Sequence, residues 1–299
     1  MLRNQPLGFL LLLAAFNILL NSCQGNEDKK NSPTTVQPES DSLSNAKLDE
    51  LKKIFFSIPS PMQMTELIEA KGYQFELDKL VPAANADKYV GESRQAMMLG
   101  IYGTDLGYAS LFKQKQTVTE YFAASQKIAR ELHLDHIMNS TLIDRFDKNK
   151  DNRDSTINIF SEVYADMNDN LKEKKRYDIA ALVIAGGWLE ALHLTSQYTA
   201  DGTEEIRQRI AEQKYSLNNL LNYLDKFGDR ASINEVKADL TRLKDGFNSV
   251  AENKGKTTTG KDKSGTTIIG TTTKIVMDDA TLNNVITITA ELRAKYTGL

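Results

Sequence analysis

The chain has 299 residues, enough for one large domain or two small ones. Hydrophobic residues make up 40% and charged residues 26%, a balance that is ordinary for a globular protein with a sizeable core. The formal net charge is −3 and no dense block of Lys and Arg occurs, so the composition argues against a nucleic-acid partner. The single Cys excludes an intramolecular disulfide and any metal site built from several cysteines.

Residues 1–22 have the pattern of a secretory signal peptide. A positive charge near the start is followed by an apolar run over residues 7–20. The run ends in the sequence LNSC (20–23), which resembles the lipobox of bacterial lipoproteins. That resemblance implies cleavage before Cys23 and acylation of its sulfur and its new amine, a dual anchor that holds a protein stably on a membrane. An ordinary signal peptide with an unmodified Cys is the alternative.

Residues 23–45 are expected to be the lipidated Cys23 and a disordered tether. The stretch from Gln24 to Ser44 has almost no apolar side chain, so it cannot bury enough surface to offset the entropy of ordering. The residue after Cys23 is Gln, whereas Asp at that place resembles an inner-membrane retention signal. The segment QGNED also resembles the acidic export signals of some surface lipoproteins. We therefore expect an outer-membrane location, on a periplasmic or cell-surface face that the sequence leaves undecided.

Residues 46–299 are predicted to form a single helical domain, an all-α bundle of about nine or ten helices. The run from Asp178 to Tyr198 is the expected central helix, because residues 179–189 have no polar side chain on any face. The run without polar side chains, residues 179–189, is too short for a bilayer span, which needs about 20 apolar residues, and it fits a buried core helix. Apolar spacing and end signals indicate further helices at residues 48–55, 61–72, 87–133 (two helices broken near 113–117), 135–146, 160–171, 203–228, 232–250 and 278–292.

Two helix starts and a small hairpin are indicated near the C-terminus. Ser232 and Glu235 form a capping box, and Asp278 is placed to cap the last helix. Residues 254–265 have the composition of a flexible loop. Residues 266–277 are rich in Thr and Ile around a central Gly, which predicts a β-hairpin. Such a hairpin is too short to be stable alone, so it must lie on the helices or on a partner.

A stripe of small residues follows one face of the predicted helix before residue 113. It consists of Ala96, Gly100, Gly103, Gly107 and Ser110. Interior Gly costs a helix roughly 1 kcal/mol against Ala, so the stripe needs a compensating reason. The first interpretation is close packing against another helix, at the Gly186-Gly187 notch. The others are a ligand groove flanked by Tyr102 and Tyr108, or a helix break at residues 103–105.

Glu190 is the most informative ionisable residue, because it lies on the otherwise apolar central helix. With His193 it makes Glu-x-x-His, a spacing that di-iron bundles use twice together with two further Glu. Only one copy occurs, so no metal is assigned. The structural interpretation of Glu190 is a narrow polar stripe at the domain surface or one satisfied buried pair. The functional interpretation is the polar end of a ligand cleft. The candidate cleft consists of Trp188, Glu190, His193, Tyr102 and Tyr108.

One polar segment resembles the start of a calcium-binding loop. Asp147, Asn149 and Asp151 have the spacing of the first three ligands of an EF-hand. However, Asn152 stands where that loop needs Gly, and Asn158 stands in place of the bidentate Glu. A polar helix–helix connection is the better interpretation, and neither a metal nor another cofactor is expected.

Two segments carry a further resemblance. YGTDLGYASLF (102–112) and GGWLEALHL (186–194), between a lipobox and a C-terminal helix, resemble a family of uncharacterised helical lipoproteins of bacteria. The resemblance implies fold and location, and no activity. No Walker, Rossmann or nucleophile-elbow pattern occurs. The expected function is that of an outer-membrane lipoprotein whose helical domain is a scaffold or binds a protein or small molecule. The alternative is a metal-assisted or acid–base enzyme that uses Glu190 and His193.

Overall fold

The computed structural model describes most of the chain after residue 60. The described residues are 61–299 without 135, 138, 150–151, 153–154, 156–157, 160–161, 164–165, 167–169, 171–175, 201–202 and 262–266. The predicted signal peptide, Cys23 and the tether lie outside this part of the chain, as does the helix predicted at residues 48–55. All described residues belong to one compact unit.

The predicted all-α class is confirmed. The described residues contain eight α-helices and one two-stranded antiparallel hairpin, slightly fewer helices than the sequence predicts for the whole chain. In chain order the helices are α2 (Pro61–Ala70), α3 (Glu92–Leu111), α4 (Lys115–Glu131), α5 (Ser140–Asn149), α7 (Tyr177–Ser196), α8 (Glu204–Leu224), α9 (Ala231–Gly246) and α10 (Asp279–Thr297). Two short 3-10 helices, η1 (Leu77–Lys79) and η2 (Ala83–Lys88), connect α2 to α3.

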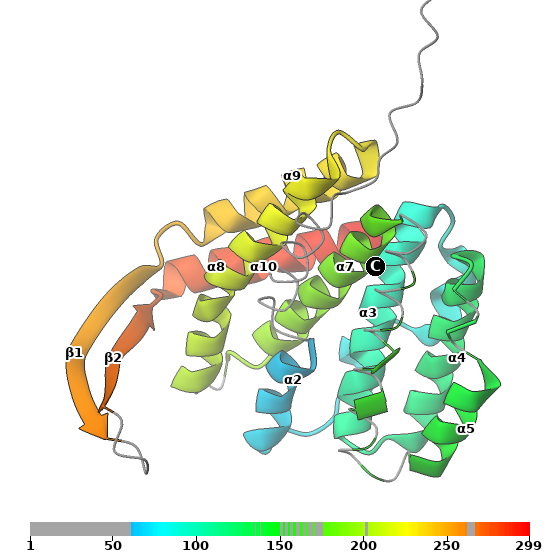
Figure 1. Cartoon of the computed structure of the whole chain (residues 1–299), viewed down its shortest axis with the longest axis horizontal. Helices are drawn as coiled ribbons and strands as arrows, with labels where there is room; N and C mark the ends of the chain where they lie inside the picture. The colour runs from blue at the N-terminus through cyan, green and yellow to red at the C-terminus, as the bar shows by residue number, and fades with distance from the viewer. Residues whose placement is uncertain are drawn as a thin grey trace, which may run out of the picture. The chain divides into compact units, whose positions relative to one another are not determined.

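Helix α7 lies in the middle of the bundle, as predicted for the central helix (Figure 1). It contacts α2, α3, α8, α9 and α10. Every residue from Ile179 to Ser196 is buried, because no face of the helix is polar enough to favour water. Among the described helices it alone is long and apolar enough to cross a bilayer, but 94% of that stretch is buried inside the domain. The helix is therefore a core helix.

The most extensive helix–helix contact joins α3 to α7, and glycine makes it possible. A Cβ atom at Gly100 would lie 2.0 Å from the carbonyl oxygen of Val183. A Cβ atom at Gly186 would lie 2.1 Å from the carbonyl oxygen of Met97. The two backbones approach more closely than any larger residue permits. The predicted packing of the small-residue stripe against the Gly186-Gly187 notch is confirmed at Gly100.

Gly103 takes no part in this contact. It is exposed, and a Cβ atom there would meet no atom within 4 Å, so the expectation that Gly103 packs against another helix is wrong. The contact runs instead along Gly100 and Thr104, whose hydroxyl donates to the carbonyl of Gly187 at 3.1 Å. Helix α3 is continuous from Glu92 to Leu111, so the alternative of a helix break at residues 103–105 is also wrong.

The helix starts agree with the predicted caps in one case and differ in another. Asp278 caps α10, because its carboxylate accepts a hydrogen bond from the backbone N–H of Thr281 at 2.7 Å. Helix α9 begins at Ala231 without a side-chain cap. Ser232 therefore lies inside the first turn, and the predicted capping box with Glu235 is wrong.

The segment that resembles a calcium loop lies largely outside the described residues. This holds for Asp151 and for the side chain of Asp147. The backbone of Asp147 belongs to α5, which extends to Asn149, three residues beyond the predicted helix end at residue 146. The first part of the segment is therefore helical.

A hairpin near the C-terminus is confirmed, but the prediction that residues 266–277 contain both of its strands is wrong, because residues 267–276 form only the second strand. Strand β1 (Ala251–Lys261) pairs with β2 (Thr267–Val276), with a register shift between Lys254 and Thr257. The first strand uses residues that we assigned to a flexible loop. Residues 257–259 are three consecutive Thr, whose β propensity outweighs the Lys and Gly around them. The ribbon projects beside α8 (Figure 1).

Candidate functional site

The predicted cleft residues lie in the packed interior of the domain. Trp188, Tyr102, Tyr108 and Glu190 are at most 1% exposed, and His193 is 9% exposed. They come from α3 and α7, the two helices in closest contact. A ligand would reach them only if these helices moved apart.

The aromatic members of the cleft already have hydrogen-bond partners within the domain. The indole of Trp188 donates to Gln213 of α8 at 3.2 Å. The hydroxyl of Tyr102 donates to the carbonyl of Pro82 at 2.9 Å. The hydroxyl of Tyr108 lies 2.5 Å from that of Tyr198. These bonds connect α3 and α7 to their neighbours, which is how buried aromatic hydroxyl and indole groups are usually satisfied.

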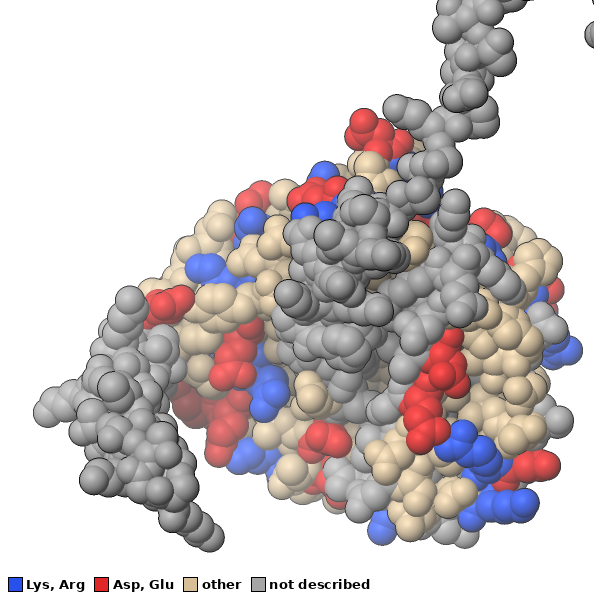
Figure 2. All heavy atoms as spheres, viewed as in Figure 1, with Lys and Arg blue, Asp and Glu red and all other residues tan. Residues whose placement is uncertain are grey.

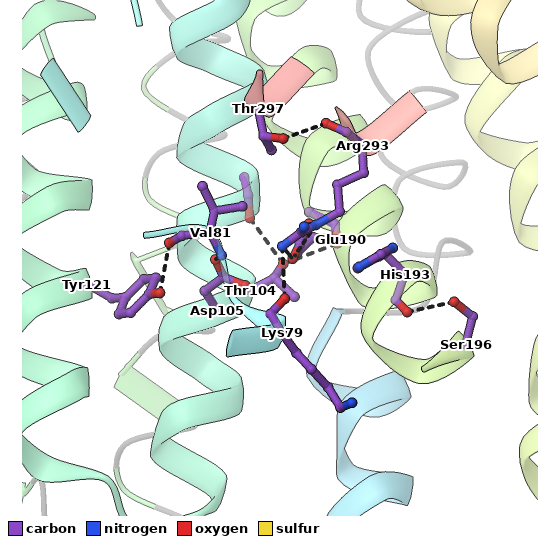
Figure 3. A network of polar contacts seen from close by, with 12 residues as sticks. Lys79, Val81, Thr104, Asp105, Tyr121, Glu190, His193, Ser196, Arg293 and Thr297 are labelled. Carbon is purple, nitrogen blue, oxygen red and sulfur yellow. Dashed lines mark hydrogen bonds and ion pairs between the residues drawn. The ribbon is translucent and has the colours of Figure 1, made fainter. Parts of the chain in front are cut away.

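Glu190 is paired with Arg293 of α10, a residue that the sequence analysis did not single out (Figure 3). The guanidinium Nε lies 3.0 and 2.7 Å from the two carboxylate oxygens, and Nη2 lies 2.8 Å from Oε1. Nη2 also donates to the carbonyl of Lys79 at 2.9 Å. The side chain of Glu190 is 0% exposed and that of Arg293 is 11% exposed. The pair therefore fastens α10 to α7 and to the end of η1.

Asp105 of α3 lies beside this pair and is also fully buried. Its Oδ2 accepts a hydrogen bond from the backbone N–H of Val81 at 3.1 Å. Its Oδ1 has no hydrogen-bond partner of ordinary geometry among the described residues. Burial, followed by the negative charge of Glu190, raises the pKa of Asp105 well above its usual value, although Arg293 opposes the rise. The environment of Asp105 favours its neutral form.

The same cluster fixes the connection between η1 and η2. The carbonyl of Val81 accepts a hydrogen bond from the hydroxyl of Tyr121 in α4 at 2.7 Å, while its N–H is bound by Asp105. The carbonyl of Lys79 is bound by Arg293. Helices α3, α4 and α10 thus all hold one short stretch of chain, an arrangement suited to holding the fold together.

No protein-family model, curated protein or solved structure matches this chain.

His193 lies one turn after Glu190 but does not join the ion pair. Its Nδ1 has no hydrogen-bond partner among the described residues. Burial lowers the pKa of His193 to about 4; the attraction of Glu190 opposes this, and repulsion from Arg293 and Lys79 adds to it. The imidazole is consequently neutral at pH 7, so it cannot act there as a charged acid.

The Glu190 and His193 spacing does not assemble a metal site in the described part of the chain. No group of three or more His, Cys, Asp or Glu side chains is placed there to hold a metal ion. Both oxygens of Glu190 are bonded to the Arg293 guanidinium. A metal ion could bind Glu190 only by displacing that cation.

A second candidate site, which the sequence did not indicate, lies at the base of the hairpin. It is a hollow of about 450 Å³, within the size range of small-ligand pockets. Arg207 lines the hollow, donates to the carbonyl of Met277 at 3.3 Å and pairs with Asp279 at 2.6 Å. The lining combines apolar and polar side chains: Ala211, Ile275, Val276 and Met277 with Glu204, Arg207, Gln208 and Asp279.

Charged side chains on the surface are mixed in sign. On the face shown in Figure 2, Lys and Arg are interspersed with Asp and Glu over the described helices. Several form pairs between neighbouring segments, such as Lys71, just after α2, with Glu205 at 2.7 Å and Arg230, just before α9, with Asp178 at 2.8 Å. No single-sign field of the kind that marks a nucleic-acid surface covers the described residues on this face.

Proposed function

We propose that the protein is a lipid-anchored lipoprotein of the outer membrane, on its periplasmic or cell-surface face, whose helical domain binds a partner without catalysis. The LNSC sequence at residues 20–23 supports the anchor, and the polar stretch 24–44 supports a tether. The hairpin and the hollow at its base are the proposed binding surface. The partner is a protein segment or a small molecule, and nucleic acid is not expected.

The observation that carries this proposal is the exposed apolar surface at the hairpin base. Val276 is 42% exposed although it belongs to β2 and lines the hollow, and Tyr215 of α8 is 40% exposed. Strands β1 and β2 form the one sheet among the described residues, so each has an edge without a strand neighbour there. Such edges bind added strands. A two-stranded ribbon is only marginally stable in water, so a bound partner would stabilise it.

The interior supports a binding role over the alternative of an enzyme that uses Glu190 and His193. Both carboxylate oxygens of Glu190 accept hydrogen bonds from Arg293, and the residue is 0% exposed, so a substrate could not reach it without movement of the described helices around it. Metal analysis of protein purified without added metal separates the two functions. A stoichiometric transition metal that is lost in Glu190→Gln would favour the enzyme.

Cys23→Ala tests the anchor. The variant should lose lipid labelling and either accumulate as precursor or appear in the soluble fraction, because acylation needs the thiol. The measurement is incorporation of labelled palmitate, followed by membrane fractionation. A variant that still labels and stays with the outer membrane would show that Cys23 is not the anchor.

The binding surface is tested by cross-linking in intact cells. A photoreactive phenylalanine at Val276 should give adducts of discrete mass, because this position lines the hollow. Val90 is the matched control, since it is an exposed Val (77%) on the connection before α3. Equal adducts at both positions, or none at Val276, would contradict the assignment of the hairpin base as the binding surface.

A further inference from the structure

The buried cluster around Glu190 contains two carboxyl groups and one guanidinium. Taken as whole residues, Asp105 and Glu190 are 0% exposed and Arg293 is 9% exposed. If both acids were ionised, the interior would hold an uncompensated negative charge, which is costly in a low-dielectric environment. We propose that Asp105 carries a proton at neutral pH and donates it to Glu190 in a hydrogen bond, so that acid, carboxylate and guanidinium together latch α10 onto the core.

The hydrogen bonds identify which acid holds the proton. Glu190 accepts from two nitrogens of Arg293, an arrangement that stabilises the ionised form. Among the described residues, Asp105 accepts a hydrogen bond only from the Val81 N–H, on Oδ2. Its Oδ1 lacks a donor among the described residues, yet the side chain lies within hydrogen-bonding reach of Glu190. A proton on Oδ1 turns this unsatisfied acceptor into a donor toward the carboxylate.

In the described part of the chain, the other groups around Asp105 supply no second positive charge. The titratable and charged groups that face it are Glu190 from α7, Arg293 from α10, Tyr121 from α4 and Tyr102 from its own helix. Burial raises the pKa of both Tyr hydroxyls, so they are neutral and donate to backbone carbonyls. Lys79 turns its ammonium away, toward Glu76 at 3.1 Å, and offers only its carbonyl to the cluster (Figure 3).

The proton makes the latch sensitive to alkali. An unfolded Asp has a pKa of about 3.9, and the pKa of Asp105 in the folded protein is raised well above its usual value. At any pH between these two pKa values, the folded state holds a proton on Asp105 that the unfolded state lacks. Unfolding then releases a proton, so the stability that Asp105 contributes falls as pH rises toward the folded value. Ionisation would leave two carboxylates competing for Arg293 and loosen α10.

Asp105→Asn tests the proposal, because Asn has the shape of the protonated acid, with an amide that can donate to Glu190 and an oxygen for Val81. In the full-length protein the variant should melt close to the wild type near pH 5 and a few degrees above it near pH 8, since the variant has no proton to lose. Any effect of His193 is common to both proteins and cancels. If the melting temperatures of variant and wild type change in parallel between pH 5 and pH 8, the proposal is overturned. A variant that melts below the wild type near pH 8 would also overturn it.

Asp239→Asn is the matched control. Asp239 is a partly exposed carboxylate that accepts hydrogen bonds from Lys295 and Tyr296. The Asp239→Asn variant should melt below the wild type near pH 5, and its melting temperature should remain below that of the wild type near pH 8.

Infrared spectroscopy of the wild type decides the question if Asp105→Asn does not fold. At pH 7 the native protein should show the carbonyl band of a protonated carboxylic acid. The band should shift when Asp is labelled with carbon-13 and disappear on unfolding. A native spectrum without such a band would overturn the proposal.

Discussion

Gly100→Ala is expected to lower the melting temperature of the full-length protein strongly, although Ala is the better helix former. The new methyl group would lie 2.0 Å from the carbonyl oxygen of Val183 and 2.6 Å from the backbone nitrogen of Gly187. Both are backbone atoms of α7, so no rotamer change relieves the clash and the helices must separate.

The size of the effect follows from two opposing contributions. Overpacking a core costs typically ~1–3 kcal/mol and sometimes more, and a backbone clash belongs at the upper end. The helix gains at most ~1 kcal/mol from Ala. We expect a net loss of about 2–3 kcal/mol, or roughly 4–12 °C in melting temperature, measured by thermal denaturation.

Gly103→Ala is the matched control for this prediction. Gly103 lies on the same helix and is exposed, and a Cβ atom added there would have no neighbouring atom within 4 Å. This substitution should therefore raise the melting temperature, since only the helix-propensity gain of up to ~1 kcal/mol remains. If both variants gain stability, α3 and α7 are not in backbone contact at Gly100.

Much of the fold could be predicted because it is encoded locally. An uninterrupted apolar run located the central helix, and the predicted Asp278 cap is present in the structure. The contact of α3 with α7 was harder to locate. The stripe of small residues defined a helix face, but where the partner helix crosses that face depends on tertiary packing. This explains why Gly100 lies in the contact and Gly103 does not.

Of the ion pair in the polar cluster, the sequence analysis identified Glu190 but not its partner. Glu190 stood out because it interrupts an apolar helix. Arg293 was missed, although it lies next to Leu292 and four residues after Thr289, which are both buried on α10. A charged residue on an inward face requires a partner of opposite charge. The partner is 103 residues away in sequence, so no local pattern could pair the two.

The hairpin base shows a different limit. Its hollow is lined by residues from α8, β2 and the start of α10, which meet only after folding. The low-complexity composition of the first strand concealed it, because Lys and Gly surround the three Thr that favour a strand. Composition describes what a segment can do alone, whereas β1 forms by pairing with β2.

Arg293→Met is the second substitution with a large expected effect. It would leave the carboxylate of Glu190 buried without its cation and the carbonyl of Lys79 without its donor. Breaking a buried ion pair by removing one partner typically costs ~3–5 kcal/mol, because a charge remains uncompensated in the interior. We expect a loss of this order in the free energy of unfolding, measured by chemical denaturation. Arg242→Met is the control: Arg242 pairs with Glu291 at the surface and is 50% exposed, so its loss should cost less than ~1 kcal/mol.

The double variant Glu190→Gln with Arg293→Met determines whether charge or packing causes this loss. Removing both charges leaves no uncompensated ion in the core, and replacing a buried pair by neutral groups is often nearly neutral for stability. The double variant should therefore be more stable than Arg293→Met alone, a non-additivity expected of residues in direct contact. Asp105 would then have no carboxylate beside it, so its proton would no longer be needed to satisfy Glu190. If the double variant instead loses as much as the two single variants combined, Arg293 stabilises α10 through packing, and the ion pair is not the latch.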